Sequence, residues 1–358
     1  MRCPARLLNY SWLLAFFTVG CKKETVIEIK EVEKQVSWRE AGPLAGLQRI
    51  ILSTGHDGQA LYLQQPDYFT RFSGGGHPPG DFRAVGRFPT DVTIRLPIGH
   101  DFFAYPASDS LLVLCRNNNP LNYEAFLYLR RLDPSAIRFN TRLFSLSKCM
   151  AINANNYLLS PYDTNRPGSP MTFLLTAVTP GAPGTRVTTS TRLVTIPVAS
   201  SSGTYVRNLA AIDDYFLVNL GGAGLYKIRQ DGSFHQVYGP AVVDAFYKWQ
   251  TTLYAPVEYN KLLTSQDAGE TWQLSSTTTP DHFTLASYYP VGDSLVGVYG
   301  SNLYSLRWQG PRYTTRFLKN DGLERATVTG IEYLRDTVYV ATTAGLFARP
   351  IKTFFDSK

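Results

Sequence analysis

Several kinds of residue are scarce in this chain of 358 residues, and each scarcity narrows the range of functions. Charged residues make up 18% and form no long basic run, so the net charge of +7 gives little support for nucleic-acid binding. No apolar run reaches the roughly 20 residues that a membrane-spanning helix needs. Cysteine occurs four times and histidine five times, without the spacing of metal ligands. The sequence therefore indicates no nucleic-acid partner, no metal and no other cofactor.

The first residues have the pattern of a secretory signal. Arg2 and Arg6 precede a short apolar run over residues 7–19, and small residues lead into Cys21. A positive start, an apolar segment and small residues predict a signal peptide over residues 1–20 that is removed on export. Its removal takes away two arginines and no acidic residue, which lowers the formal net charge from +7 to +5.

The end of this signal resembles the lipobox of bacterial lipoproteins. Residues 18–21 read Thr-Val-Gly-Cys, and two lysines follow directly. The resemblance implies that Cys21 is the lipid attachment site of an outer-membrane lipoprotein in the bacterial cell envelope. Thr18 departs from the leucine usual at its position, and the alternative is an ordinary cleaved signal. Residues 21–35 carry apolar side chains at three- and four-residue spacing, which predicts a helical tether, with a short coiled-coil seam as the alternative.

From residue 49 onward, pairs of short β-type runs recur in place of a helical period. The first runs cover residues 49–54, 110–115, 157–162, 215–220, 252–257, 294–299 and 337–342. Their partners cover residues 60–65, 125–131, 172–178, 224–230, 261–267, 302–308 and 345–351. The last four pairs begin 37, 42 and 43 residues apart, and a period near 40 is typical of four-stranded propeller blades. We expect an all-β, seven-bladed β-propeller over residues 36–358, with one or two β-sandwiches as the alternative.

One motif is specific. Residues 265–272 read Ser-Gln-Asp-Ala-Gly-Glu-Thr-Trp and resemble the Asp-box of sialidases and of many exported propellers. The chain is thus similar to bacterial lipoproteins with a BNR/Asp-box propeller of the sialidase-like, YVTN- or WD40-like kind. The resemblance implies a structural turn between the third and fourth strands of a blade. Asp267 would accept backbone N–H bonds, Gly269 would take a positive φ, and Trp272 would pack between blades. The motif residues are Ser265, Asp267, Gly269, Thr271 and Trp272.

A second copy of the motif's end precedes the first strand pair. Residues 36–39 read Val-Ser-Trp-Arg, with Trp38 in the place of Trp272. An open ring would expose two sheet edges, which closed folds avoid. We therefore expect residues 35–39 to form the outer strand of the seventh blade, with Trp38 packed between the last blade and the first. The alternative is that residues 351–355 supply this strand.

Catalytic residues are not found by motif. The patterns of serine hydrolases, zinc peptidases and phosphate loops do not occur. The sialidase resemblance implies an arginine triad and a Tyr–Glu pair, of which only Arg95, in Arg-Leu-Pro, has a counterpart. Cys115 and Cys149 are the pair left for a disulfide, which export permits, and two separate buried thiols are the alternative.

These observations favour an exported, membrane-anchored lipoprotein whose propeller is a non-enzymatic module that binds a protein, peptide or glycan. A sialidase-like glycoside hydrolase is the alternative, because a propeller fold by itself does not choose between functions. Arginines and carboxylates gathered at the central channel would favour the hydrolase, and an exposed aromatic patch there would favour the binding module.

Overall fold

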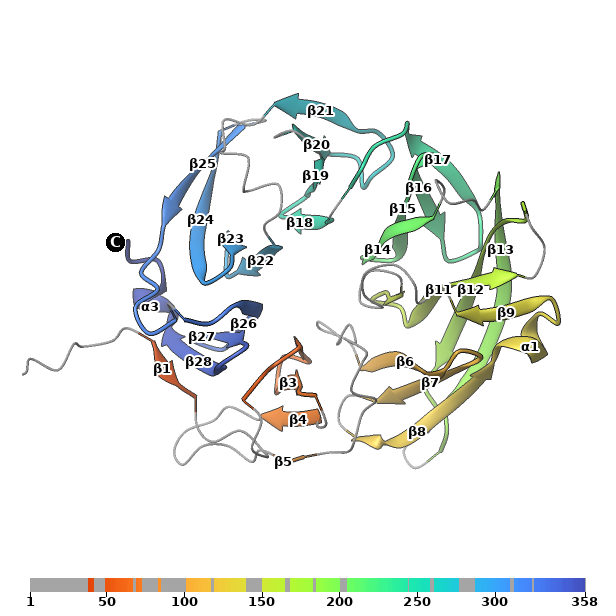
Figure 1. Cartoon of the computed structure of the whole chain (residues 1–358), viewed down its shortest axis with the longest axis horizontal. Coiled ribbons are helices and arrows are strands. Elements are labelled where there is room, and N and C mark those ends of the chain that lie inside the picture. The colour runs from red at the N-terminus through yellow and green to blue at the C-terminus, as the bar shows by residue number, and fades with distance from the viewer. Residues whose placement is uncertain are drawn as a thin grey trace, which may run out of the picture. The chain divides into compact units, whose positions relative to one another are not determined.

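Seven β-sheets are arranged around a ring in the computed structural model (Figure 1). The chain divides into two units, Met1–Gln35 and Val36–Lys358, and the sheets belong to the second. The structure describes residues 38–41, 49–66, 69–72, 83–84, 101–116, 119–139, 150–164, 168–182, 185–199, 205–243, 245–257, 261–276, 287–309, 312–323 and 325–357. The expected signal peptide, tether, Cys21, Arg95 and Cys149 lie outside these residues. The prediction of an all-β, seven-bladed propeller is confirmed.

The blades are antiparallel sheets that follow one another along the chain. Blade one contains β2 Ser53–His56, β3 Leu61–Gln64, β4 Phe69–Phe72 and β5 Arg83–Ala84, and blade two contains β6 Phe102–Ser108, β7 Leu111–Arg116 and β8 Asn119–Tyr128. Blade three contains β10 Ala151–Ile152, β11 Tyr157–Thr164, β12 Pro170–Thr179 and β13 Thr188–Ala199, and β9 Ala136–Phe139 also pairs with β11. Blade four contains β14 Val206–Ile212, β15 Tyr215–Leu220, β16 Gly224–Arg229 and β17 Phe234–Tyr238.

The remaining blades have four described strands each. Blade five contains β18 Tyr247–Trp249, β19 Thr252–Val257, β20 Lys261–Ser265 and β21 Gln273–Ser276. Blade six contains β22 Ser287–Val291, β23 Ser294–Tyr299, β24 Asn302–Gln309 and β25 Arg312–Phe317. Blade seven contains β26 Val328–Leu334, β27 Thr337–Thr342, β28 Gly345–Pro350 and β1 Arg39–Glu40. The helices α1 Leu129–Leu132 and α3 Ile351–Phe354 span four residues each, and neither of these described helices could cross a bilayer.

The expected strand pairs form the second and third strands of six blades. β15 is buried at all six positions, because neighbouring blades cover both faces of its sheet. Blade one is the exception: its expected runs fall on β2 and β3, which are the first and second strands. The third strand there, β4, reads Phe-Thr-Arg-Phe and is too short to show a pattern of its own.

The amino-terminal part of the propeller completes blade seven. β1 pairs antiparallel with β28, with Arg39 opposite Ala348 and Glu40 opposite Phe347 (Figure 1). The expected strand over residues 35–39 therefore begins later, at Arg39, and residues 35–37 lie outside the described residues. The alternative strand over residues 351–355 is wrong, because Ile351–Phe354 forms α3.

Trp38 packs between blades six and seven, and the expectation of packing between the last and first blades is wrong. It is 2% exposed, in one apolar cluster with residues of β22 to β24 and β26 to β27. Its indole Nε1 donates to the carbonyl oxygen of Lys319 at 3.0 Å, and Phe354 meets the ring edge-on at 5.8 Å. Trp272 behaves alike, since it packs between its own blade and the preceding one. A tryptophan that begins an outer strand points toward the preceding blade in both cases.

The inner strands of blades seven and one meet at a glycine. A Cβ atom on Gly330 of β26 would lie 2.3 Å from Thr54 Oγ1 on β2, so only glycine allows this approach. Glu332 then reaches blade one, accepting a bond from Thr54 Oγ1 at 2.8 Å and pairing with His56 Nδ1 at 2.6 Å. The hydrogen bond to Glu332 raises the pKa of His56, although burial opposes the shift.

Cys115 is a free thiol in the part of the chain that the structure describes, and its suggested partner, Cys149, lies outside that part. It is fully buried between blades one and two, in a cluster that includes Tyr62, Phe69 and Phe103. Burial raises the pKa of the thiol to about 12. Cys115 therefore packs as a small apolar side chain.

Candidate functional site

The turn formed by residues 265–272, called here the 265–272 turn, connects β20 to β21, the third and fourth strands of blade five. Asp267 is its centre: its carboxylate accepts a bond from Ser265 Oγ at 2.8 Å and from Thr271 Oγ1 at 2.6 Å. The backbone N–H of Thr271 donates to both carboxylate oxygens, at 2.9 and 3.1 Å. Both oxygens of Asp267 are thus used inside the turn.

Backbone conformation and packing explain the glycine. Ala268 and Gly269 have φ values of 56° and 83°, in the left-handed region. A Cβ on Gly269 would lie 3.3 Å from side-chain atoms of both Leu217 and Leu253, and the N–H of Gly269 donates to Ser265 Oγ at 2.9 Å. The carbonyl oxygen of Gly269 accepts from Trp272 Nε1 at 3.2 Å, which anchors the indole beneath the turn.

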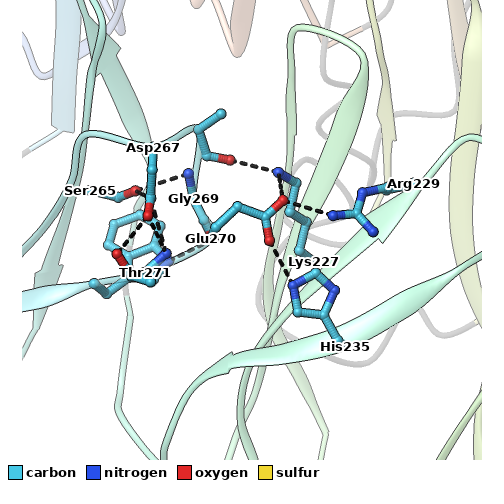
Figure 2. Close-up of polar contacts among 10 residues, drawn as sticks. Lys227, Arg229, His235, Ser265, Asp267, Gly269, Glu270 and Thr271 are labelled. Carbon is cyan, nitrogen blue, oxygen red and sulfur yellow. Dashed lines mark hydrogen bonds and ion pairs between the residues drawn. The ribbon is translucent and has the colours of Figure 1, made fainter.

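Glu270 connects this turn to blade four. One carboxylate oxygen pairs with Lys227 Nζ at 2.7 Å and Arg229 Nη2 at 2.8 Å, and the other with His235 Nε2 at 2.8 Å. Figure 2 shows Glu270 pointing toward these three side chains, which come from β16 and β17, whereas Asp267 points back into its own turn. Lys227 is buried and also donates to the carbonyl oxygen of Ala268 at 2.8 Å. These contacts of Glu270 therefore connect blade five to blade four.

Both acidic groups are held in the ionised form. Hydrogen bonds from Thr271 lower the pKa of Asp267 to about 2. The bond from Lys227, followed by those from Arg229 and His235, lowers the pKa of Glu270 to about 2. A general acid needs a pKa near the working pH, so neither carboxyl group can donate a proton at neutral pH. The arrangement suits a structural tie and not acid–base catalysis.

A shallow hollow of about 350 Å³ lies beside the 265–272 turn. Asp213, Tyr215, Lys248, Thr251 and Gln266 contribute to its lining. Lys248 Nζ pairs with Asp213 Oδ2 at 2.5 Å. Asp267 also lines the hollow, with its carboxylate oxygens engaged inside the turn. All three charged side chains that line the hollow are therefore already paired or hydrogen-bonded within the protein.

Glu124 and Glu332, which each lie next to a tyrosine in the sequence, also belong to structural pairs. Glu124 lies 2.9 Å from Arg116 Nε, and Glu332 is bound to His56 and Thr54. Within the described residues, no group of three or more His, Cys, Asp and Glu side chains is placed to hold a metal ion.

Sequence reasoning identified the 265–272 turn but missed the contacts of Glu270. Lys227 and Arg229 alternate along β16, so their side chains share one face, and this was the available signal. Nothing in the local sequence shows that this face meets the following blade at residue 270, because the contact spans 43 residues.

Asp267→Ala should lower the free energy of unfolding by about 1 kcal/mol, since several hydrogen bonds to an exposed carboxylate are lost. Thermal unfolding measures the change. Gln266→Ala is the matched control in the same turn, because Gln266 is also exposed and makes none of the turn's hydrogen bonds described above. Equal destabilisation by the two changes would contradict the central role of Asp267.

Glu270 should make the free energy of unfolding depend on pH in the acidic range. A folded-state pKa lowered from 4.5 to about 2 stabilises the fold above pH 4.5, and this contribution is lost as the pH falls from 4.5 toward 2. Chemical unfolding at several pH values should show a large difference between the wild type and Glu270→Gln at pH 6, which narrows toward pH 2. A difference independent of pH would show that the ionised carboxylate is not the stabilising group.

Comparison with known proteins gives the fold and no more. No family model matches the chain, and no curated protein matches its sequence. Among solved structures, the chain resembles one in the "Crystal Structure of Mitotic Checkpoint Complex", with a TM-score of 0.52, 10% identity, and coverage of 87% of this chain and 93% of that one. It resembles YCF48 bound to D1 peptide with a TM-score of 0.50 and 11% identity, over 88% of this chain and 96% of that one.

A third similar structure is the extracellular domain of the putative hybrid two-component system BT4673 from B. thetaiotaomicron, with a TM-score of 0.50 and 11% identity. The match covers 87% of this chain and spans 39% of that chain. Identities this low show a shared propeller fold alone.

Proposed function

We propose that this chain is an exported bacterial lipoprotein, anchored in the outer membrane through Cys21, whose propeller binds a partner without catalysing a reaction. The export signal and the lysines after Cys21 support the anchor. Two or three acyl chains would hold the protein stably, whereas one binds a membrane only marginally.

One observation carries the binding role: blade two exposes aromatic side chains on a strand whose outer edge pairs with no other described strand. Two carboxylates outside this blade, Glu270 and Glu332, are committed to ties between blades. YCF48, a structure of the same fold, was solved bound to D1 peptide, so such a propeller can hold a peptide. A protein or peptide partner is therefore favoured over a glycan.

Two measurements test the proposal. Cell fractionation should find the protein with membranes and Cys21→Ser in the soluble fraction; unchanged membrane association of Cys21→Ser would contradict lipid anchoring. The full chain in detergent should not release the fluorophore from a synthetic aryl sialoside. Turnover that follows the purified protein through gel filtration would replace the binding role with a glycosidase.

A further inference from the structure

Blade two is the sheet with the fewest described strands. Its order is β6-β7-β8, whereas every other sheet has four or more strands. The next strand along the chain, β9, would be the natural fourth strand, yet it pairs with β11 of blade three. The ten-residue strand β8 is therefore an outer edge that no other described strand pairs with.

The exposed aromatic side chains of β8 share one face. The register places Tyr128, Phe126 and Tyr123 opposite Leu111, Val113 and Cys115 of β7. Paired residues of neighbouring strands point to the same face, so all three rings lie on the side of blade two that carries the buried Cys115. The rings of Tyr123 and Phe126 lie 5.6 Å apart.

The exposure of these rings is unusual for this propeller. Tyr123, Phe126 and Tyr128 are 45%, 41% and 43% exposed, whereas Trp272 and Trp38 are 8% and 2% exposed because they pack on the preceding blade. Blade one, which precedes blade two, ends in a strand of only two residues, β5 Arg83–Ala84. In the part of the chain that the structure describes, the outer strand of blade one is therefore much shorter than β8.

Two arginines lie in α1, which directly follows the carboxyl end of β8, and Asp133 lies at the end of the same helix. Arg131 lies over the ring of Tyr128, at 4.5 Å from its centroid, and Arg130 beside it is exposed. The one carboxylate near the middle of the strand, Glu124, is 8% exposed and paired with Arg116. A segment lying along this edge would thus meet aromatic rings on one face and two guanidinium groups at one end.

We propose that the outer edge of β8 binds an extended acidic peptide segment of another protein, which pairs as the fourth strand of blade two. The edge strand supplies backbone donors and acceptors, Tyr123, Phe126 and Tyr128 contact apolar side chains at alternate positions, and Arg130 and Arg131 attract carboxylates. This inference rests on the proposed binding role and names the class of partner.

The test uses the full chain in detergent and a fluorescent ten-residue peptide that alternates valine or threonine with glutamate. Fluorescence anisotropy should show saturable binding that weakens as salt rises. Phe126→Asp should weaken binding about tenfold or more, the loss expected for a residue at the centre of an interface. Arg131→Glu, at one end of the edge, should weaken binding and reduce its dependence on salt. Leu274→Asp is the matched control, since Leu274 is 49% exposed on blade five, and it should leave affinity unchanged.

Three further probes separate the parts of the proposal. A peptide methylated at alternate backbone nitrogens should fail to bind, because strand pairing needs its N–H groups. A peptide with lysine in place of glutamate should bind more weakly. Hydrogen exchange should show new protection at residues 123–128 when the acidic peptide is added.

Several results would overturn the proposal: no binding up to about 1 mM peptide, equal binding of the methylated or the lysine peptide, or protection away from β8. Sedimentation that shows a dimer, dissociated by Phe126→Asp, would assign the edge to a second copy of this chain. These outcomes leave the membrane and sialoside measurements unaffected, so failure of this inference and failure of the proposed function can be told apart.

Discussion

Trp38→Ala should lower the free energy of unfolding by about 3–5 kcal/mol, the usual cost of truncating a fully buried tryptophan. The indole is 2% exposed, donates to Lys319 O and is met edge-on by Phe354, while the guanidinium of Arg349 lies 5.9 Å from its ring centroid. These contacts join the outer strand of blade seven to the connection that follows blade six and to α3. Urea unfolding, followed by far-UV circular dichroism of the backbone, measures the loss in the free energy of unfolding.

Trp249→Ala is the control for this change, because Trp249 is only partly buried, although it also donates its indole N–H, to Asp293 O. It should cost clearly less than Trp38→Ala. A pair of truncations tests the same closure: a chain that starts at residue 36 should keep the stability of the full chain, and one that starts at residue 42 should lose both Trp38 and β1. Equal stability of the two truncated chains would show that β1 does not close the ring.

Gly330→Ala should destabilise the fold by about 1–3 kcal/mol, the cost of forcing extra atoms into a packed interface. The new Cβ would lie 2.3 Å from Thr54 Oγ1 and 3.2 Å from Thr54 Cβ, so β2 and β26 would have to separate. Separation would also weaken the bonds of Glu332 to Thr54 and His56. Thermal unfolding of the purified variant measures the effect.

A double-mutant cycle with Thr54→Ala checks the cause. Thr54→Ala removes the hydroxyl that the new Cβ would strike, so the double variant should recover part of the stability lost by Gly330→Ala. Gly297→Ala is the matched control on β23, since its Cβ would meet the mobile end of Leu306 at 3.2 Å, a contact that can relax. Additive losses in the cycle would show that the two residues do not clash.

Much of the fold could be predicted because the same pattern of short apolar runs recurs from blade to blade. The runs over residues 215–220, 252–257, 294–299 and 337–342 coincide with β15, β19, β23 and β27. These runs alternate little between apolar and polar residues, and almost all of their residues are buried. A nearly continuous apolar run therefore indicates a strand that is covered on both faces. The 265–272 turn was predictable for the same reason, since its hydrogen bonds join residues within four positions of each other.

The first two blades were harder to predict. The strands β4 and β5 span four and two residues, which is too short for a periodic pattern. The strand β9 was not expected, and its pairing with β11 leaves β8 as an outer edge. A sequence pattern shows that a segment is a strand but not which strand it pairs with, because the same alternation fits either neighbour.

The sequence by itself determined the β-class of this protein, the number of its blades and the chemistry of its one specific turn, because these depend on residues close together in the chain. Only the tertiary structure decided how the ring closes and which surface is left open. Trp38 bonds to a residue 281 positions away, Thr54 bonds to one 278 positions away, and β8 is an outer edge because β9 pairs with β11 of blade three. Contacts over such distances arise from the packing of whole sheets, and no local pattern encodes them.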